Sequence, residues 1–219
     1  MSEQKNLKPI LRFKQFSDNW IFKNLNQVGE VVNGLTYNPS NISKDGILVL
    51  RSSNIKGNQL SFLDNVFVTV DNFNAVKKND ILICVRNGSR NLIGKNALIT
   101  EEAEGLAFGA FMSIFRSNNN RFIFQLFATK NYFKTIHENL GATINSINNS
   151  EIKQFKFAFP SENEQQKIAT FLTAVDEKIN LLQKKKQGLE QYKKGVMQQL
   201  FSQKLRFKKE DGSDYPDWE

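Results

Sequence analysis

The chain has 219 residues, of which 40% are hydrophobic, and its formal net charge is +8. This hydrophobic content predicts a folded globular protein and excludes a disordered chain. The basic charge favours an acidic partner such as nucleic acid or a membrane surface, and the single cysteine excludes a disulfide framework.

The first part of the chain, residues 1–17, is polar and basic with little periodicity, and we predict an N-terminal arm there. Residues 18–160 read as short mixed elements punctuated by Gly and Asn, which predict an α+β domain with a mixed sheet. One helix is expected over 121–139, with its apolar side chains on one side. Strands are expected at 47–50, 65–70, 81–85, 97–100, 111–115 and 152–159.

Cys84 lies within the apolar run 81–85, so we expect a buried structural thiol rather than a reactive one. A chain with one cysteine fits a reducing cytoplasm best. The N-terminal residues have no apolar signal region, and no run approaches the roughly 20 apolar residues that cross a bilayer. We therefore expect a soluble, cytoplasmic protein with no membrane partner.

A helix start follows Pro160. The residues from Ser161 to Glu164 have the form of a capping box, in which the serine oxygen accepts the N3 amide and Glu164 reaches back to the cap amide. Residues 161–203 then predict one helix about 60 Å long, at 1.5 Å per residue. Its apolar positions keep a period of 3.5 residues, typical of a coiled-coil seam that cannot bury itself alone. The seam residues are Ile168, Leu172, Val175, Ile179, Leu182, Leu189, Val196 and Leu200, with Lys186 and Lys193 at intervening seam positions.

The tail, residues 204–219, repeats the opening phrase of the chain. Leu11-Arg12-Phe13-Lys14 is followed by Trp20, and Leu205-Arg206-Phe207-Lys208 is followed by Trp218. The shared order favours a true internal repeat over chance. On this interpretation the tail resembles the start of a second unit, and the chain is one unit of a two-unit design.

The residues that usually carry catalysis do not assemble into a site. His137, the one histidine, falls on a predicted polar helix face, where a solvated side chain is expected. One histidine and one cysteine cannot build a usual zinc site, and the sequence has no Gly-rich phosphate or cofactor loop. The Asp176-Glu177-Lys178 fragment resembles part of a nuclease motif, but its charges fit the outer face of the predicted coiled coil. We therefore expect a non-catalytic chain without its own metal or cofactor.

Several polar loops carry groups that can contact DNA. Arginine can bind guanine or phosphate with two hydrogen bonds, asparagine can pair with adenine, and glycine and serine allow close backbone approach. Ordinary turns with solvated charges explain any single loop equally well. Together, in a chain of charge +8, the loops favour DNA contact by Asn33, Thr36, Tyr37, Arg51, Ser53, Asn54, Arg86, Asn87, Ser89, Arg90, Lys95, Thr143 and Asn145.

At this point a family resemblance becomes specific. The stretch from Phe159 to Ala169, followed in register by Leu172, Asp176 and Ile179, resembles the motif that opens the conserved helix of type I restriction–modification specificity subunits. The stretch from Tyr192 to Phe201 is similar to the end of that helix. Residues 77–83, 86–89 and 93–95 are similar to the family's recognition-domain core, and the Leu-Arg-Phe…Trp phrase resembles its N-terminal lead-in.

The resemblance implies a fold with two target-recognition domains, each followed by a long conserved helix, and with the two helices antiparallel. This chain has one recognition domain, expected at 18–160, and one spacer helix, expected at 161–203, so it resembles a half-length subunit. The implied function is to direct a methyltransferase subunit, and optionally a restriction–translocation subunit, to a bipartite site on double-stranded DNA. Catalysis and S-adenosylmethionine binding then belong to the methylating partner, which would flip an adenine out of the stack.

An unburied seam without a second helix leads to the hypothesis of a homodimer through residues 161–203. Two-fold symmetry would place identical readers at opposite ends, on a palindromic target with a spacer. Lys186 and Lys193 either fix the register of the helices or lie where the methyltransferase packs. Two rival interpretations remain: a free-standing restriction or methylation enzyme, whose motifs the chain lacks, and an anti-restriction module that binds the methyltransferase without reading DNA.

Overall fold

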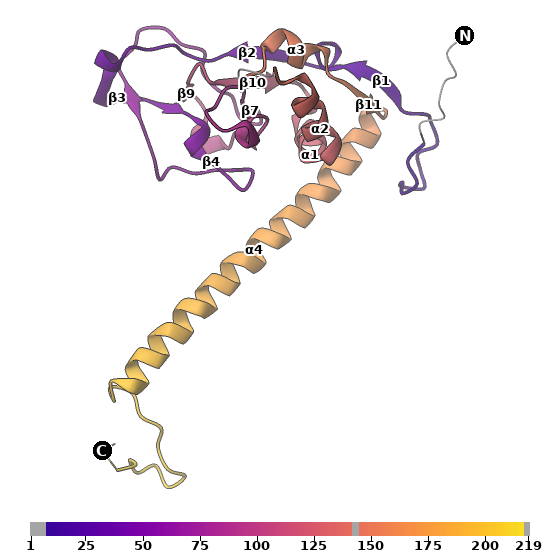
Figure 1. Cartoon of the computed structure of the whole chain (residues 1–219). Coiled ribbons are helices and arrows are strands. Elements are labelled where there is room, and N and C mark those ends of the chain that lie inside the picture. Colours follow the sequence, from indigo (N-terminus) through magenta and orange to yellow (C-terminus); the bar gives the residue numbers. More distant parts are fainter. Residues whose placement is uncertain (1–7, 142–144, 217–219) are drawn as a thin grey trace. The chain divides into compact units, whose positions relative to one another are not determined.

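The computed structural model describes residues 8–141 and 145–216, and the chain divides into two compact units, residues 1–170 and 171–219 (Figure 1). The first unit contains all the sheets, three short α-helices and the first turns of the long helix. The second unit contains the remainder of that helix and the C-terminal tail. Among the described residues, no helix has both the length and the apolarity needed to cross a membrane.

The first unit is built around short sheets that combine parallel and antiparallel pairing, as the sequence predicted. A four-stranded antiparallel sheet has the order β2 (Glu30–Asn33), β10 (Met112–Arg116), β7 (Ile81–Cys84) and β8 (Asn96–Leu98). In the three-stranded sheet, β3 (Ile42–Leu50) pairs antiparallel with β6 (Phe67–Val68) and parallel with β9 (Ala107–Phe108). Two antiparallel pairs complete the set: β1 (Ile21–Asn24) with β11 (Lys156–Phe159), and β4 (Ile55–Lys56) with β5 (Gln59–Leu60).

The helices of the first unit correct two predictions. The helix expected over 121–139 is two helices, α1 (Asn120–Phe127) and α2 (Lys130–Asn139). The Thr129 side chain begins α2 by accepting a hydrogen bond from the Tyr132 amide at 3.3 Å, an N-cap that turns the chain. The strand expected over 152–159 was wrong in its first half, where α3 (Asn149–Gln154) forms because Asn148 and Glu151 make a capping box.

The core explains why residues 81–85 form an uninterrupted apolar run. Strand β7 is buried on both faces, and its side chains alternate between two packed clusters. Ile81 and Ile83 pack in the apolar cluster that includes residues of α1 and α2. Leu82 and Cys84 pack in the apolar cluster that includes residues of β3 and β8. A strand with two apolar faces needs no polar alternation. The polar loop that follows β7 is therefore anchored on a strand that is buried along its whole length.

The expected burial of Cys84 is confirmed, since its side chain is inaccessible to solvent. Burial raises the pKa of the Cys84 thiol because it disfavours the thiolate, which is the reactive form. We expect the native protein to react with a thiol reagent at pH 8 at least ~100-fold more slowly than the urea-unfolded chain. Mass spectrometry reports this site alone, because the chain has one cysteine. Equal labelling rates in native buffer and in urea would contradict the buried-thiol assignment.

The N-terminal arm is fixed to the start of the long helix α4 (Glu162–Phe201). Arg12 donates from Nε and Nη2 to the two carboxylate oxygens of Glu164, at 2.7 and 2.6 Å, and Glu164 is 1% exposed. The hydrogen bond to Glu164 raises the pKa of the Arg12 guanidinium. The predicted capping role of Glu164 is thus replaced by an ion pair with a residue 152 positions away. Ser161 still begins the helix, since its carbonyl accepts the Gln165 amide at 2.9 Å.

Helix α4 is continuous over 40 residues, as the seam pattern predicted. Its first turns belong to the first unit, where Ile168 packs against the core and Ala169 is buried. In the second unit the predicted seam residues Val175, Ile179, Leu182 and Leu189 are between 41% and 58% exposed, and Leu172, Val196 and Leu200 are half-buried. Lys186 lies beside Glu190, with 3.8 Å between Nζ and Oε1. The apolar seam is therefore largely uncovered within this chain.

The tail after α4 is held by short-range contacts. Lys208 pairs with Asp214 as an isolated bridge, and Arg206 donates from Nη2 to the Tyr215 carbonyl at 2.6 Å and to the Pro216 carbonyl. Trp218, which completes the predicted repeat, lies outside the described residues.

Candidate nucleic-acid interface

Three of the polar loops predicted to contact DNA meet at the end of β7. The Asn87 side chain donates to the Ser52 hydroxyl at 2.9 Å, and Lys95 Nζ donates to the Ser52 carbonyl at 3.1 Å. The Asn145 side chain donates to the Gly88 carbonyl at 2.9 Å, and the Asn87 amide donates to the Asn145 carbonyl at 3.2 Å. Residues 51–54, 86–91, 109–111 and 145–147 thus form one surface, which we call the loop cluster.

The fourth predicted loop, residues 33–38, runs alongside the loop cluster. The Leu35 amide donates to the Phe108 carbonyl at 2.7 Å, and Leu35 forms a parallel bridge with Gly109. The residues of this loop that were predicted to contact DNA differ in their burial and in their hydrogen-bond partners. Asn33 Oδ1 accepts the Asn149 side-chain amide at 2.5 Å, Tyr37 is half-buried against the small core cluster around Val49, and Thr36 is exposed.

Gly34 was predicted to punctuate a turn, and the structure gives it a different role. A Cβ atom at this position would lie 2.1 Å from the Gly109 carbonyl oxygen and 2.6 Å from its carbon. The two backbones therefore approach too closely for any side chain. This close approach keeps residues 33–35 beside the segment that leads into Phe111.

Asn54 was predicted to contact DNA, but it is a structural residue with no exposed surface. Its Nδ2 donates to the carbonyls of Ser61 and Asp64 at 3.0 and 3.1 Å, and its Oδ1 accepts the Arg51 amide at 2.9 Å. A short polar side chain that folds back on nearby backbone is typical of such turns. Asn54 therefore shapes the 51–54 turn from within and presents nothing to a partner.

Asn54→Ala is expected to lower the free energy of unfolding by about 2–3 kcal/mol, because it leaves buried amide and carbonyl groups without partners. Urea denaturation followed by circular dichroism measures the change. Asn72→Ala is the matched control, since Asn72 is exposed, and its effect should stay within about 0.5 kcal/mol. Equal stabilities of the two variants would contradict the structural role of Asn54.

The loop arginines differ in what they bind. Arg51 Nη2 lies 3.0 Å from the Asp64 carboxylate, and the Arg90 guanidinium donates to the carbonyls of His137 and Gly141 at 3.3 and 3.2 Å, at the end of α2. A cation suits the carbonyl end of a helix. Arg86 is exposed, and its guanidinium makes no hydrogen bond or ion pair in the part of the chain that the structure describes. Of these three, Arg86 is the one whose donors all remain available.

The remaining predicted contact residues also have definite places. The Ser89 amide donates to Asn87 Oδ1 at 3.0 Å, which folds the 86–91 loop, and the Ser89 side chain is exposed. Ser53 is half-buried, with its hydroxyl oxygen enclosed. Thr143 lies outside the described residues.

Sequence reasoning missed Phe111. This residue is 56% exposed, and the Arg86 guanidinium carbon lies 5.5 Å from the centre of its ring. The sequence places Phe111 at the start of an apolar stretch, where a core position is the natural expectation. Gly109, two residues earlier, was the available signal, because glycine favours turns.

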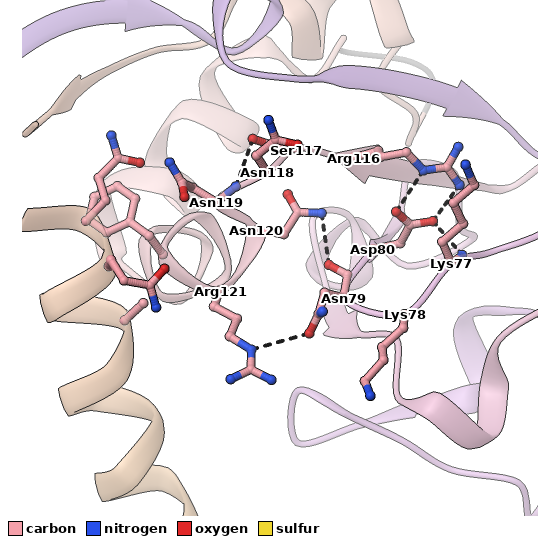
Figure 2. Close-up of a pocket in the computed structure, with 14 residues that line it drawn as sticks. Lys77, Lys78, Asn79, Asp80, Arg116, Ser117, Asn118, Asn119, Asn120 and Arg121 are labelled. Carbon is pink, nitrogen blue, oxygen red and sulfur yellow. Dashed lines mark hydrogen bonds and ion pairs between the residues drawn. The ribbon is translucent and has the colours of Figure 1, made fainter. Parts of the chain in front are cut away.

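A separate polar cavity of about 370 Å³ lies between residues 77–80, residues 116–122 and the first turns of α4 (Figure 2). Figure 2 shows its lining groups bonded mainly to each other: Arg116 binds Asp80 through Nε and Nη2 at 2.9 and 2.6 Å, and the Asn120 side chain donates to the Asn79 carbonyl at 2.9 Å. Burial of Asp80 at 3% exposure makes this ion pair structural. The lining includes none of the residues predicted to contact DNA.

The polar loops and the long helix of the described residues together indicate a class of protein. Donor groups of arginine and asparagine side chains gather at the end of a buried strand, and the sequence continues into a long helix with an uncovered apolar seam. No group of three or more potential metal ligands occurs within residues 8–141 and 145–216. This combination is that of an α+β domain with clustered polar loops, followed by a long helix with exposed apolar side chains.

The comparisons identify the family. The family model described as "Type I restriction modification DNA specificity domain" matches residues 17–191. The match spans the recognition domain and most of α4, and the chain belongs to this family. The resemblance to type I restriction–modification specificity subunits is therefore confirmed.

Similar proteins agree with this assignment. The chain is 28% identical over 223 aligned residues to the putative type I restriction enzyme MjaX specificity subunit of Methanocaldococcus jannaschii, covering 94% of this chain and 52% of that protein. It is 26% identical to the type I restriction enzyme EcoKI specificity subunit of Escherichia coli K12, covering 82% of this chain and 42% of that protein. The chain thus spans about half the length of these relatives.

Solved structures share the fold. A chain from a structure of the type I restriction–modification system superposes with a TM-score of 0.61 at 15% identity, covering 81% of this chain and 43% of that one. The HsdS subunit of Thermoanaerobacter tengcongensis gives a TM-score of 0.55 at 14% identity, covering 75% of this chain and 39% of that subunit. The predicted class, an α+β domain followed by a long C-terminal helix, is confirmed.

Proposed function

We propose that this chain reads DNA as a specificity component of a type I restriction–modification complex and catalyses no reaction itself. The observation that carries the proposal is the loop cluster, in which the exposed side chains of Arg86 and Ser89 lie in the loop that follows the rigid strand β7. Loops on a rigid scaffold are where binding residues concentrate. The net charge of +8 favours the phosphate backbone of DNA, which supplies affinity while the loops supply sequence choice.

The predicted contact residues are not equally suited to this role. Arg86, Ser89 and Thr36 are exposed in or beside the loop cluster, and we propose them for direct contact with DNA together with Thr143. The other predicted residues of these loops would contribute mainly through the shape of the loops, because their polar groups are enclosed or bound to the protein; they are Arg51, Ser53, Asn87, Arg90, Lys95 and Asn145.

A methyltransferase subunit is the proposed catalytic partner, with a restriction–translocation subunit as an optional third component. In this arrangement S-adenosylmethionine binds to the methyltransferase, and the DNA target is bipartite. The recognition component positions the complex, and the partner methylates an adenine that is flipped out of the duplex. We expect the complex of this chain, the methyltransferase and DNA to form in the cytoplasm.

We further propose that two copies of the chain associate through α4. The seam residues Val175, Ile179, Leu182 and Leu189 are 41–58% exposed, and a second identical helix would cover them. Two-fold symmetry would then place one loop cluster at each end of the pair and favour a palindromic target with a spacer. Lys186, in the seam, would limit the register because a buried ammonium group is costly.

Co-expression with the methyltransferase tests the function directly. The genome of the expressing cells should carry methyladenine at every copy of one bipartite sequence, and cells without this chain should lack that pattern. The purified chain alone should neither methylate nor cut DNA, and such an activity would overturn its non-catalytic assignment. A complex that forms with the methyltransferase but shows no salt-dependent, sequence-specific DNA binding would instead favour an anti-restriction module.

A further inference from the structure

Phe111 occupies an unusual position for a large aromatic residue. It is 56% exposed immediately before β10, and its carbonyl accepts both the Val85 amide at 2.9 Å and the Arg86 amide at 3.1 Å. These two bonds fix its backbone against the residues that leave β7. An exposed aromatic ring on a fixed backbone is a ready contact surface, since it loses little conformational freedom on binding.

The Arg86 guanidinium lies over this ring, 5.5 Å from its centre. An aromatic ring attracts the positive charge of a guanidinium group that lies over its face. Stacking on the ring also restricts the orientation of the guanidinium plane, and with it the directions of the N–H donors. Because those donors make no hydrogen bond or ion pair within residues 8–141 and 145–216, the restriction leaves them free for an external acceptor. Arg90 provides the contrast, since its donors are used on carbonyls of the protein.

The pair also lies between the other loops. Arg86 forms an antiparallel bridge with Ser146, and the neighbouring Asn145 side chain ties that strand segment to Gly88. Polar groups from 86–91 and 145–147 therefore flank Arg86 and Phe111. A phosphate contact needs only charge, whereas a fixed guanidinium plane beside an exposed apolar ring matches the two features that base edges offer in the major groove.

We propose that Arg86 and Phe111 form one base-reading unit in duplex DNA. Arg86 binds the O6 and N7 acceptors of a guanine, and Phe111 contacts the 5-methyl group of a thymine in an adjacent base pair. The ring also orients the guanidinium, so the two residues act together rather than independently. This inference rests on the proposed DNA-reading function and adds to it the residues and the base chemistry.

Modified bases test the pair. The full chain is purified with its methyltransferase, and its methylated sequence supplies the duplex. Replacing one guanine in this duplex by 7-deazaguanine, which lacks N7, should weaken binding of the wild-type complex by about 5- to 100-fold. Replacing an adjacent thymine by uracil, which lacks the methyl group, should weaken it by about 3- to 10-fold. Arg86→Ala should bind the 7-deazaguanine duplex and the unmodified duplex equally, and Phe111→Ala should do the same for the uracil duplex.

The variants also distinguish the reading unit from simpler explanations. The combined loss in the double variant should be smaller than the product of the two single losses, because Phe111 orients Arg86. Arg121→Ala is the matched control, because Arg121 is exposed on α1 outside the loop cluster, and it should keep both base preferences. Circular dichroism and thermal unfolding should be unchanged in Phe111→Ala, whose ring is exposed.

Two results would overturn the inference. Uniform weakening across all sequences in Arg86→Ala would make Arg86 a phosphate contact, and full retention of both base preferences by the variants would remove the pair from base reading. In either case specific binding by the wild-type complex would leave the proposed function intact. A wild-type complex that binds no specific sequence would refute the proposed function itself, and this inference with it.

Discussion

Glutamate at two seam positions of α4, in the variant Ile179→Glu with Leu182→Glu, is expected to convert the proposed dimer into a monomer. In the single chain the Ile179 and Leu182 side chains are 46% and 54% exposed, so a second helix would bury them. Burying a large aliphatic side chain contributes roughly 1.5–3 kcal/mol, and each helix of a pair would contribute both positions. In the dimer of the variant the seam would hold four carboxylates instead. Their loss of hydration and their mutual repulsion would both disfavour association. We expect the dissociation constant to rise by at least about 1000-fold.

Analytical ultracentrifugation between about 1 and 100 µM would measure this change. The matched control is Gln183→Glu with Gln187→Glu, which adds two carboxylates to the same helix outside the seam, where both side chains are exposed. The control should sediment as the wild-type dimer. A seam variant that remains dimeric would show that another surface holds the pair, and a monomeric wild-type chain would remove the homodimer from the proposal.

The second large effect is expected from Gly34→Ala. The added Cβ would lie 2.1 Å from the Gly109 carbonyl oxygen, so the segments 33–35 and 108–110 must separate. Separation would break the hydrogen bond from the Leu35 amide to the Phe108 carbonyl. Overpacking against fixed backbone costs about 3 kcal/mol, at the upper end of the usual range. The displaced segment leads into Phe111, so specific DNA binding should weaken as well.

Urea denaturation measures the stability loss of this variant, and a one-methyl control is available in the same unit. Gly88→Ala adds the same group in the 86–91 loop, where nothing lies within 4 Å of the new Cβ. Its stability should change by no more than about 0.5 kcal/mol. Gly34→Ala with wild-type stability would show that the two backbones can move apart at little cost.

The sequence predicted the parts of the fold that have a strong local signal. The apolar run that contains Cys84 predicted β7, and the 3.5-residue period predicted α4 because both patterns are repeated over many side chains. The split between α1 and α2 was missed because the Thr129 cap lies inside a continuous apolar periodicity. The first half of the strand expected over 152–159 was wrong because alternation over few residues fits a helical turn as well.

The candidate site was less predictable, because it depends on contacts between distant segments. Each polar loop was visible, yet nothing in the sequence indicated that Asn87 would bind Ser52, 35 positions away. Asn54 and Arg86 look equivalent in the sequence, but the first is fully buried and the second exposed. Exposure of Phe111 depends on how β10 meets the end of β7. Arg12 and Glu164 likewise form a pair that only the folded chain brings together.

The bonds that join residues 85–87 to Phe111 and to residues 145–147 run largely through the main chain. The Arg86 amide binds the Phe111 carbonyl, the Asn87 amide binds the Asn145 carbonyl, and the Ile147 amide binds the Val85 carbonyl. A hydrogen bond between two main-chain groups is kept in most replacements of the side chains of those residues. Mutation can therefore exchange the outward-facing groups of these loops while the scaffold keeps its form. Under the proposed function, replacement of these outward-facing groups would change the DNA sequence that is read while the domain stays folded.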